Sequence, residues 1–247
     1  MPWPLVASST VVTAAAVSYL EPGARAIAPF RRGLFPQLSG YGDARHVALT
    51  FDDGPDPVST PHLVNLLAEW NVHATFFMLG SMAAAAPGLA REVAAAGHQI
   101  AVHGWSHRVM TADRPAVVYR ELARARDTVA ATTGQVPAWF RPPYGILTRG
   151  ALAAARRLEL RPLLWTSCGR EWQRGATPAS VLSTLFRTLD GGGTILLHDS
   201  DQQARAGSAG AARAALPALL TECARRGLTV GTVAEHGPAF RTRTGPG

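Results

Sequence analysis

Short runs of strand-forming residues alternate with helical stretches along most of the chain, and this alternation constrains the fold more than any other feature. The expected strands are 46–51, 74–78, 99–102, 138–140, 163–165, 194–197 and 228–230. The stretches between them have helical spacing or composition and cover 60–70, 83–96, 113–133, 148–158, 178–189 and 209–226. Strands that alternate with helices form parallel sheets, because each helix returns the chain to the same end of the sheet. The sequence therefore predicts an α/β fold, a parallel barrel or sheet of about seven strands.

The first expected strand ends in two neighbouring carboxylates, Asp52 and Asp53, and the breaker Gly54-Pro55 follows them. In parallel α/β folds, ligands bind at the carboxyl ends of the strands. Neighbouring side chains of an extended chain point in opposite directions, so we expect the two acids to serve different partners. One would hold a metal ion and the other would handle a proton. By themselves these four residues are also typical of an ordinary turn.

Two histidines, His103 and His107, follow the third expected strand where it ends. Their spacing allows both imidazoles to bind one ion, although the same spacing also occurs by chance in loops and surface helices. Together with Asp53 they form a set of two histidines and a carboxylate, which leaves coordination positions open for water and substrate. We expect one divalent ion here, with zinc as the first choice and cobalt or nickel as alternatives.

A proline-rich loop after the fourth expected strand holds Arg141 and Tyr144. Arg141 could pair with Asp52 and keep it ionised, or it could solvate the turn. Pro142 and Pro143 restrict the backbone, so the amide of Tyr144 could be aimed at an oxyanion.

His198 ends a wholly apolar strand and is the expected proton donor. A histidine at a strand end is more often structural, and only its companions favour a catalytic role. Asp199 and Asp201 could touch the substrate, but we expect them to solvate the turn. His98 follows a glycine between a helix and a strand, and we interpret it as structural.

Together these motifs resemble the polysaccharide deacetylases with a NodB homology domain, the carbohydrate esterases of family 4. The resemblance implies a distorted (β/α) barrel with an open groove, and a metal-dependent hydrolase that removes N-acetyl groups from an N-acetylated glycan or amino-sugar conjugate. The five motifs stand in the family's order as Thr50-Phe51-Asp52-Asp53, His103 to His107, Arg141 to Tyr144, Cys168 to Trp172, and Leu196-Leu197-His198.

The resemblance also implies a role for each motif residue. His198, as the general acid, would protonate the leaving amine, so that the products are acetate and a free amino sugar. The roles are general base for Asp52, metal ligand for Asp53, His103 and His107, orientation of the base for Arg141, oxyanion stabilisation by the amide of Tyr144, walls of the acetyl pocket for Trp172 and Leu196, and general acid for His198.

One motif departs from the family's usual Asp-x-x-Asp-Trp, because this chain has Cys168 in place of the first aspartate and Glu171, one methylene longer, in place of the second. Glu171 could pair with a protonated His198 or with Arg141. Cys168 is expected to be a small buried filler. The change affects the expected substrate class and optimum pH more than the reaction type.

The sequence is also compatible with two other functions. The same fold could hydrolyse a non-carbohydrate amide or a cyclic imide. A non-catalytic glycan-binding protein is the second alternative, although it would have no need for the clustered charges of a catalytic site.

The N-terminal stretch 3–20 is free of charge, and we expect either a membrane anchor or uncleaved signal, or a soluble helix packed on the domain. The expected parts are an apolar segment and linker over 1–40, a deacetylase domain over 41–236 and a flexible tail over 237–247. The location in a bacterial cell stays undecided, with the cytoplasm slightly favoured over the membrane or export.

The charge pattern limits the partners. All 24 basic residues are arginines, and the net charge of +7 is spread without a compact cluster interleaved with aromatics, so we expect no nucleic-acid partner. The two cysteines, Cys168 and Cys223, lie too far apart in the sequence for a cysteine zinc motif. We expect a monomer that binds an N-acetylated glycan or amino sugar.

Overall fold

The computed structural model describes residues 33–111, 113–204 and 206–240. Within these residues, eight short strands form one sheet in which every pairing is parallel. They are β1 (His46–Asp52), β2 (Thr75–Met78), β3 (Gln99–Val102), β4 (Trp139–Phe140), β5 (Arg161–Pro162), β6 (Ser167–Cys168), β7 (Thr194–His198) and β8 (Thr229–Gly231).

The sheet curls into an open half-barrel, as the α/β prediction requires. Its strand order is β5-β4-β3-β2-β1-β7-β6, and β8 pairs with the first residues of β1. The outermost strands β5 and β6 do not pair with each other, so the barrel stays open on that side. The central strand β1 is buried along its whole length, which fits the mainly apolar and β-branched residues that precede the first carboxylate.

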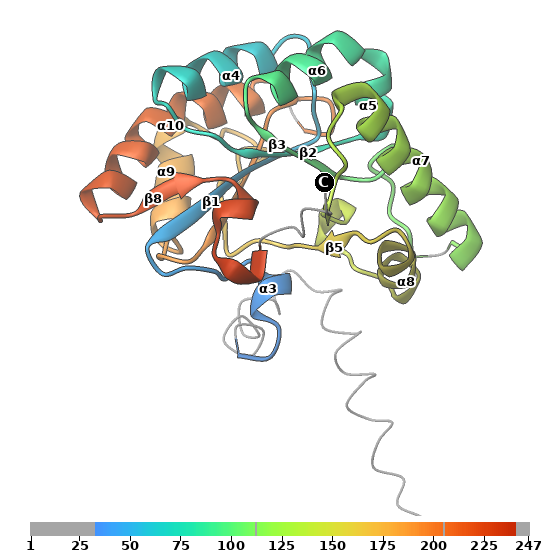
Figure 1. Cartoon of the computed structure of the whole chain (residues 1–247). Coiled ribbons are helices and arrows are strands. Elements are labelled where there is room, and N and C mark those ends of the chain that lie inside the picture. The colour runs from blue at the N-terminus through green and yellow to red at the C-terminus, as the bar shows by residue number, and fades with distance from the viewer. Residues whose placement is uncertain (1–32, 112, 205, 241–247) are drawn as a thin grey trace, which may run out of the picture.

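Helices cover the outer face of the curved sheet, with α9 and α10 towards one end and α7 and α8 towards the other (Figure 1). The helices in the described residues are α3 (Pro36–Ser39), α4 (Thr60–Glu69), α5 (Gly80–Ala85), α6 (Pro87–Ala95), α7 (Pro115–Thr133), α8 (Arg149–Arg157), α9 (Pro178–Phe186) and α10 (Ser208–Arg225). Short 3-10 helices are η2 (Pro143–Gly145), η3 (Val233–Glu235) and η4 (Pro238–Phe240).

The main hydrophobic core lies between the sheet and this outer layer of helices. Val47, Leu49 and Phe51 of β1 belong to it, together with apolar residues of α4, α6, α9 and α10. Ala48, between them in the sequence, belongs instead to a smaller cluster with Phe77 of β2 on the inner face. This alternation places Asp52, the last residue of β1, on the inner side of the half-barrel.

Two expected elements differ from the structure. The stretch 163–165 is not a strand, because it crosses between the two open edges, and the Leu164 N–H donates to Leu38 O at 2.8 Å. The expected helix 83–96 is two helices, because Ala86 has φ −129° and ψ 63° and Pro87 starts α6. A residue before proline avoids the helical conformation.

The packed domain extends beyond the expected boundary at residue 236. Residues 238–240 form η4, and Phe240 is buried and stacks on Trp139 at a ring distance of 5.5 Å. The rest of the expected tail and the stretch 3–20 lie outside the described residues. Among the helices that the structure describes, none has the length and apolar character needed to cross a membrane.

Candidate active site

The candidate site is a cavity of about 350 Å³ at the carboxyl ends of the strands. Two of the ten predicted site residues, Arg141 and Glu171, are buried and do not line it. The other eight do, and they are Asp52, Asp53, His103, His107, Tyr144, Trp172, Leu196 and His198.

The lining also contains residues that the sequence does not predict as site residues, namely Pro142, Gly145, Ile146, Trp165, Gln203 and Ala204. Trp165 belongs to the stretch 163–165, which the sequence predicts to be a strand and which is not a strand in the structure. The exposed Gln203 stands in the loop after β7, where no sequence pattern marks it.

The two neighbouring carboxylates converge instead of pointing in opposite directions. Asp52 Oδ2 lies 3.6 Å from His103 Nε2, and Asp53 Oδ1 lies 3.4 Å from the same atom. The expected alternation fails because Asp53 has a φ of 82°, which takes it out of the extended conformation of β1. A non-glycine residue in this region is uncommon and is maintained by its surroundings.

Asp53, His103 and His107 form a compact set of buried ligand atoms. One ligand atom from each residue lies within 4.8 Å of the others. His103 Nδ1 lies 2.8 Å from Arg141 O, and because a carbonyl can only accept, Nδ1 carries the proton and Nε2 keeps its lone pair towards Asp53. Asp53 Oδ1 has no hydrogen-bond partner among the described residues. These features fit a divalent metal ion.

His107 is available as a ligand in its neutral form. Its Nε2 lies 3.4 Å from Asp53 Oδ1. Burial, followed by the neighbouring His103, lowers the pKa of His107 to about 4, although Asp53 and Asp52 act in the opposite direction. A metal ion binds the neutral imidazole.

Asp52 is held by the buried guanidinium of Arg141. Arg141 Nη1 donates to Asp52 Oδ1 at 2.6 Å and to Thr50 Oγ1 at 2.8 Å, and Nη2 donates to Leu164 O at 3.1 Å. The guanidinium carbon also lies 4.0 Å from the centre of the Phe77 ring. These contacts fix one oxygen of Asp52 and leave Oδ2 facing His103.

Of the two partners expected for Glu171, the structure pairs it with His198 and not with Arg141. His198 Nδ1 donates to Glu171 Oε1 at 2.8 Å, so the longer side chain of glutamate still reaches the imidazole. Burial alone would lower the pKa of His198, but the charge and hydrogen bond of Glu171, with the charges of Asp53 and Asp52, raise it to about 9. Trp172 lies edge-on to this imidazole at a ring distance of 5.1 Å.

The loop with Tyr144 closes one side of the cavity. Tyr144 has a φ of 57°, its side chain is 57% exposed, and its ring lies 4.5 Å from that of His107. Gly145, which follows it, allows close packing, because a Cβ atom there would stand 2.8 Å from the Trp165 ring.

Comparison with known proteins assigns the family. The family model for polysaccharide deacetylase matches residues 39–163. The chain belongs to the polysaccharide deacetylase family. A chitooligosaccharide deacetylase of Bradyrhizobium sp. (strain ANU 289) is 35% identical over 170 residues, which are 67% of this chain and 77% of that protein. The peptidoglycan-N-acetylglucosamine deacetylase PgdA of Listeria monocytogenes is 32% identical over 66% of this chain and 34% of its own length.

Solved structures of polysaccharide deacetylase relatives have the same fold. The family 4 carbohydrate esterase from Streptomyces lividans, in complex with acetate, is 32% identical with a TM-score of 0.68, over 76% of this chain and 92% of that one. A family 4 pseudoenzyme from Bacillus anthracis, at 22% identity, has a TM-score of 0.72 over 79% of this chain and 66% of that one. Because a pseudoenzyme shares this fold, the fold alone does not establish catalytic activity.

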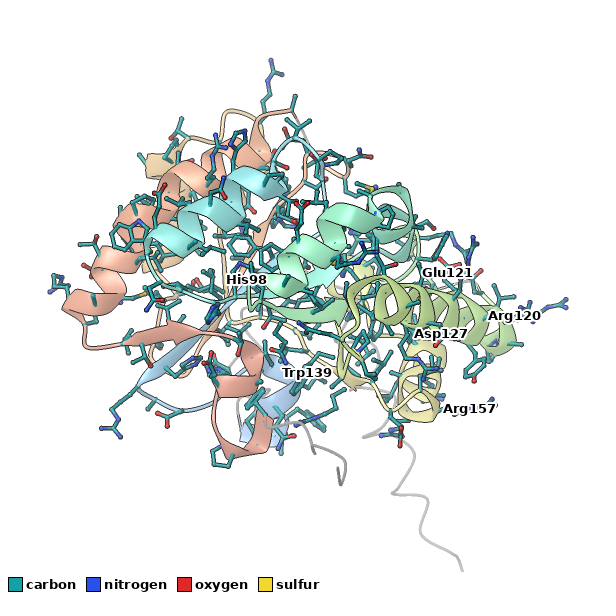
Figure 2. All side chains as sticks on the ribbon, turned by 45° about the horizontal axis from the view of Figure 1, so that its top comes forward. His98, Arg120, Glu121, Asp127, Trp139 and Arg157 are labelled. Carbon is teal, nitrogen blue, oxygen red and sulfur yellow. The ribbon has the colours of Figure 1, made fainter. Side chains whose placement is uncertain are left out.

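Two further residues that the sequence analysis singles out lie outside the cavity lining. His98 is buried just before β3 (Figure 2) and does not line the cavity. Its Nδ1 accepts from the Ala74 N–H at 3.2 Å, and burial lowers its pKa to about 4. Cys168 is half-buried in β6, beside Leu196 of β7 in the register.

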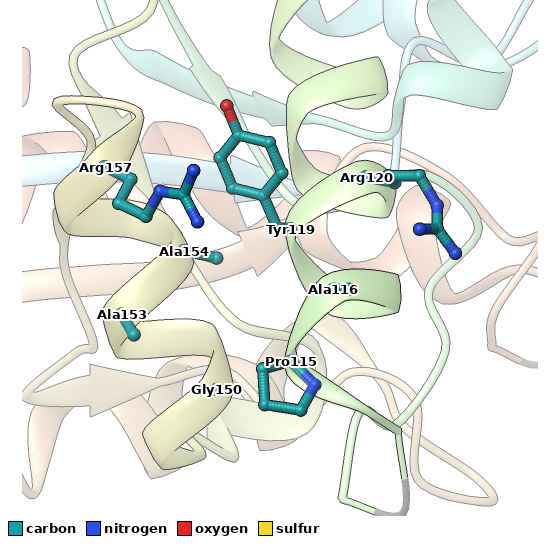
Figure 3. Close-up of a pocket in the computed structure, with 8 residues that line it drawn as sticks. All are labelled: Pro115, Ala116, Tyr119, Arg120, Gly150, Ala153, Ala154 and Arg157. Atoms are coloured by element: carbon teal, nitrogen blue, oxygen red, sulfur yellow. The ribbon is translucent and has the colours of Figure 1, made fainter.

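A second hollow, of about 390 Å³, lies between α7 and α8 (Figure 3). Tyr119 and Arg157 point towards each other across it, and the guanidinium carbon lies 4.5 Å from the ring centre. Among the described residues, its lining contains no histidine, cysteine or carboxylate, so it has none of the groups that deacetylation needs.

Proposed function

We propose that this member of the polysaccharide deacetylase family is a metal-dependent hydrolase that removes N-acetyl groups from an N-acetylated glycan. The observation that carries the proposal is that a possible metal site, a carboxylate and an imidazole lie in one cavity. Asp53, His103 and His107, which could hold a metal ion, lie there together. The carboxylate of Asp52 and the imidazole of His198 each lie within 4.0 Å of a member of this set. Hydrolysis of an amide needs a base for the attacking water and an acid for the leaving amine.

Asp53, His103 and His107 would hold the ion, and zinc is the first choice for a site of two histidines and one carboxylate. When bound, such an ion lowers the pKa of water and polarises a carbonyl oxygen. The side chains of this chain supply the base, the acid and the walls of the acetyl pocket.

Asp52 acts as the general base. Its Oδ1 is occupied by Arg141, and its Oδ2 is directed towards the ligand set, where it can accept a proton from the attacking water. The guanidinium of Arg141 fixes the orientation of this carboxylate, so that Oδ2 stays directed towards the ligand set.

His198 acts as the general acid. Its Nδ1 is hydrogen-bonded to Glu171, so Nε2 is the atom that can donate a proton to the nitrogen of the breaking amide bond. The raised pKa keeps this imidazole protonated at neutral pH. The C–N bond breaks as the amine takes this proton, and acetate and an amino sugar leave.

Trp172, Leu196 and Tyr144 surround the acetyl group. Leu196 and Trp172 line the cavity on the side of His198 and give an apolar wall for a methyl group. The backbone N–H of Tyr144 is the proposed donor to the developing oxyanion, in a loop that two prolines restrict.

An N-acetylated glycan is the substrate class that the relatives favour, since their names refer to chitooligosaccharides and peptidoglycan. The experiment is a mass-spectrometric screen of the zinc-loaded protein against chitooligosaccharides, peptidoglycan fragments and small non-carbohydrate amides. Loss of an acetyl mass from the glycans supports the proposal. Turnover of the amides alone would favour the rival substrate, and turnover of none would favour a binding protein.

The Glu171→Gln variant should show a basic limb of the pH-rate profile at lower pH than the wild type, by about one pH unit or more. His198 must be protonated to act as the acid, so the rate falls as the pH rises past its pKa. Glutamine keeps a hydrogen-bond acceptor but removes the negative charge that raises this pKa, while burial continues to lower it. Measurement of kcat/KM against pH for both proteins tests this.

Two further variants sharpen the comparison. Glu159→Gln is the control, because this exposed carboxylate lies outside the cavity and should leave the profile unchanged. Glu171→Asp restores the family's usual residue but shortens the side chain in a backbone that fits glutamate, so we expect reduced activity. Coincident basic limbs for the wild type and Glu171→Gln would show that Glu171 does not tune His198.

A further inference from the structure

Asp199 is buried beneath the turn that follows β1 and is 2% exposed, although the sequence suggested a solvated turn residue. Its N–H donates to Asp52 O at 3.2 Å, which continues the pairing of β7 with β1 by one residue. Asp199 does not line the cavity. Its carboxylate therefore has a role other than contact with the substrate.

Both oxygens of the Asp199 carboxylate have partners near the metal ligand Asp53. Oδ1 accepts from the Gly54 N–H at 2.9 Å, and Oδ2 accepts from the Thr60 hydroxyl at 2.7 Å. The Thr60 hydroxyl itself accepts from the Asp56 N–H at 2.8 Å. The carboxylate is thus fixed by α4 and in turn holds the peptide that joins Asp53 to Gly54.

This peptide determines where the Asp53 side chain points. Asp53 has a φ of 82°, and the direction of the next N–H sets its ψ angle. Gly54 is also anchored through its carbonyl, which accepts from the Leu79 N–H at 3.0 Å. The packing is close, because a Cβ atom on Gly54 would stand 2.0 Å from Asp199 Oδ2.

We propose that Asp199 is a positioning residue, which holds the Asp53–Gly54 peptide so that Asp53 leaves the strand conformation and turns its carboxylate onto His103 and His107. This inference rests on the proposed function, because it assigns Asp53 to the metal. Without the Asp199 carboxylate, the Gly54 N–H loses its acceptor, and the left-handed conformation of Asp53 loses the contact that maintains it. The Asp53 carboxylate would then spend less time in the binding position.

The test compares the zinc affinity of the full-length wild type with that of Asp199→Ala and Asp199→Asn, by competition with a chromogenic chelator. We expect Asp199→Ala to raise the Kd roughly tenfold to a hundredfold, as for other residues that orient metal ligands. Asp199→Asn should recover most of the affinity. Its amide oxygen can still accept from Gly54, and the Thr60 hydroxyl can turn to Asp199 O, which lies 3.3 Å away.

Asp56→Ala is the matched control. Asp56 is buried in the same loop and accepts from the Val58 and Ser59 N–H groups and from Ser200 Oγ, but it has no bond to Gly54. Loss of the Asp56 carboxylate should lower the midpoint temperature of thermal unfolding and leave the zinc Kd at the wild-type value. Cobalt absorption spectra should change for Asp199→Ala and not for Asp56→Ala, because they report the ligand geometry directly.

Equal Kd values for the wild type and Asp199→Ala would overturn the inference while leaving the proposed function intact. Failure of the wild type to bind zinc would contradict the proposed function and, with it, this role. If Asp199→Ala does not fold, Thr60→Val replaces it, since that variant removes the donor to Oδ2 with little change of shape. It should raise the Kd to a smaller extent, and an unchanged Kd would count against the inference.

Discussion

The Asp52→Asn variant should retain its metal ion and lose about 100-fold or more in kcat/KM, the loss expected when a general base is removed. Asparagine has the same shape, and its amide oxygen can still accept from Arg141, which holds Oδ1 at 2.6 Å in the wild type. The group that faces His103 becomes neutral and cannot take a proton from water. Steady-state kinetics together with elemental analysis of the same preparation measure both properties.

The control for Asp52→Asn is the Asp56→Asn variant. Asp56 is also a buried aspartate, but it lies in the loop after β1 and does not line the cavity. This variant should keep most of the activity. Near wild-type turnover by Asp52→Asn would remove Asp52 from the role of base. Loss of the metal as well would mean that Asp52 is a ligand rather than a base.

Removal of the metal should abolish activity, and addition of zinc or cobalt should restore it. At the level of a single ligand, His103→Ala should contain much less metal than the wild type, because the set loses one of its three donors. Elemental analysis of the purified variant checks the metal content, and an acetate assay before and after chelation checks the activity.

His98→Ala provides a matched control for His103→Ala. Both residues are 2% exposed, but His98 lies outside the cavity, and its Nδ1 accepts from the Ala74 N–H. Its removal should cost stability and leave the metal content unchanged. Full metal content in His103→Ala would exclude this residue from the site, and full activity after exhaustive chelation would exclude a metal-dependent reaction.

The sequence predicted the positions of the site residues because its polar residues interrupt apolar runs at strand ends. Asp52, His103 and His198 each follow or end a strand with a strong apolar pattern, and parallel strands bring such ends together. The break between α5 and α6 was predictable from Pro87. The absence of a strand at 163–165 was not predictable, because the backbone of this stretch bonds to Leu38, a residue distant in the sequence.

The detailed geometry of the site could not be predicted from the sequence, for a related reason. The expectation that Asp52 and Asp53 diverge assumed a regular strand, whereas the φ of Asp53 depends on contacts with distant elements. Asp199 resembles an ordinary turn aspartate until the fold buries it against Gly54 and Thr60. The sequence left Glu171 with two candidate partners, and only the packing of β6 beside β7 places it against His198.

The most direct measurement is acetate release from an N-acetylated chitooligosaccharide in ¹⁸O-labelled water by protein of verified zinc content. Attack of water on the acetamide carbonyl predicts acetate that carries one oxygen from the solvent, together with an equal amount of free amine. The same reaction should be lost in the zinc-stripped protein and in Asp52→Asn. A zinc-loaded wild-type protein that releases no acetate from any N-acetylated glycan, or acetate without solvent oxygen, would contradict the account.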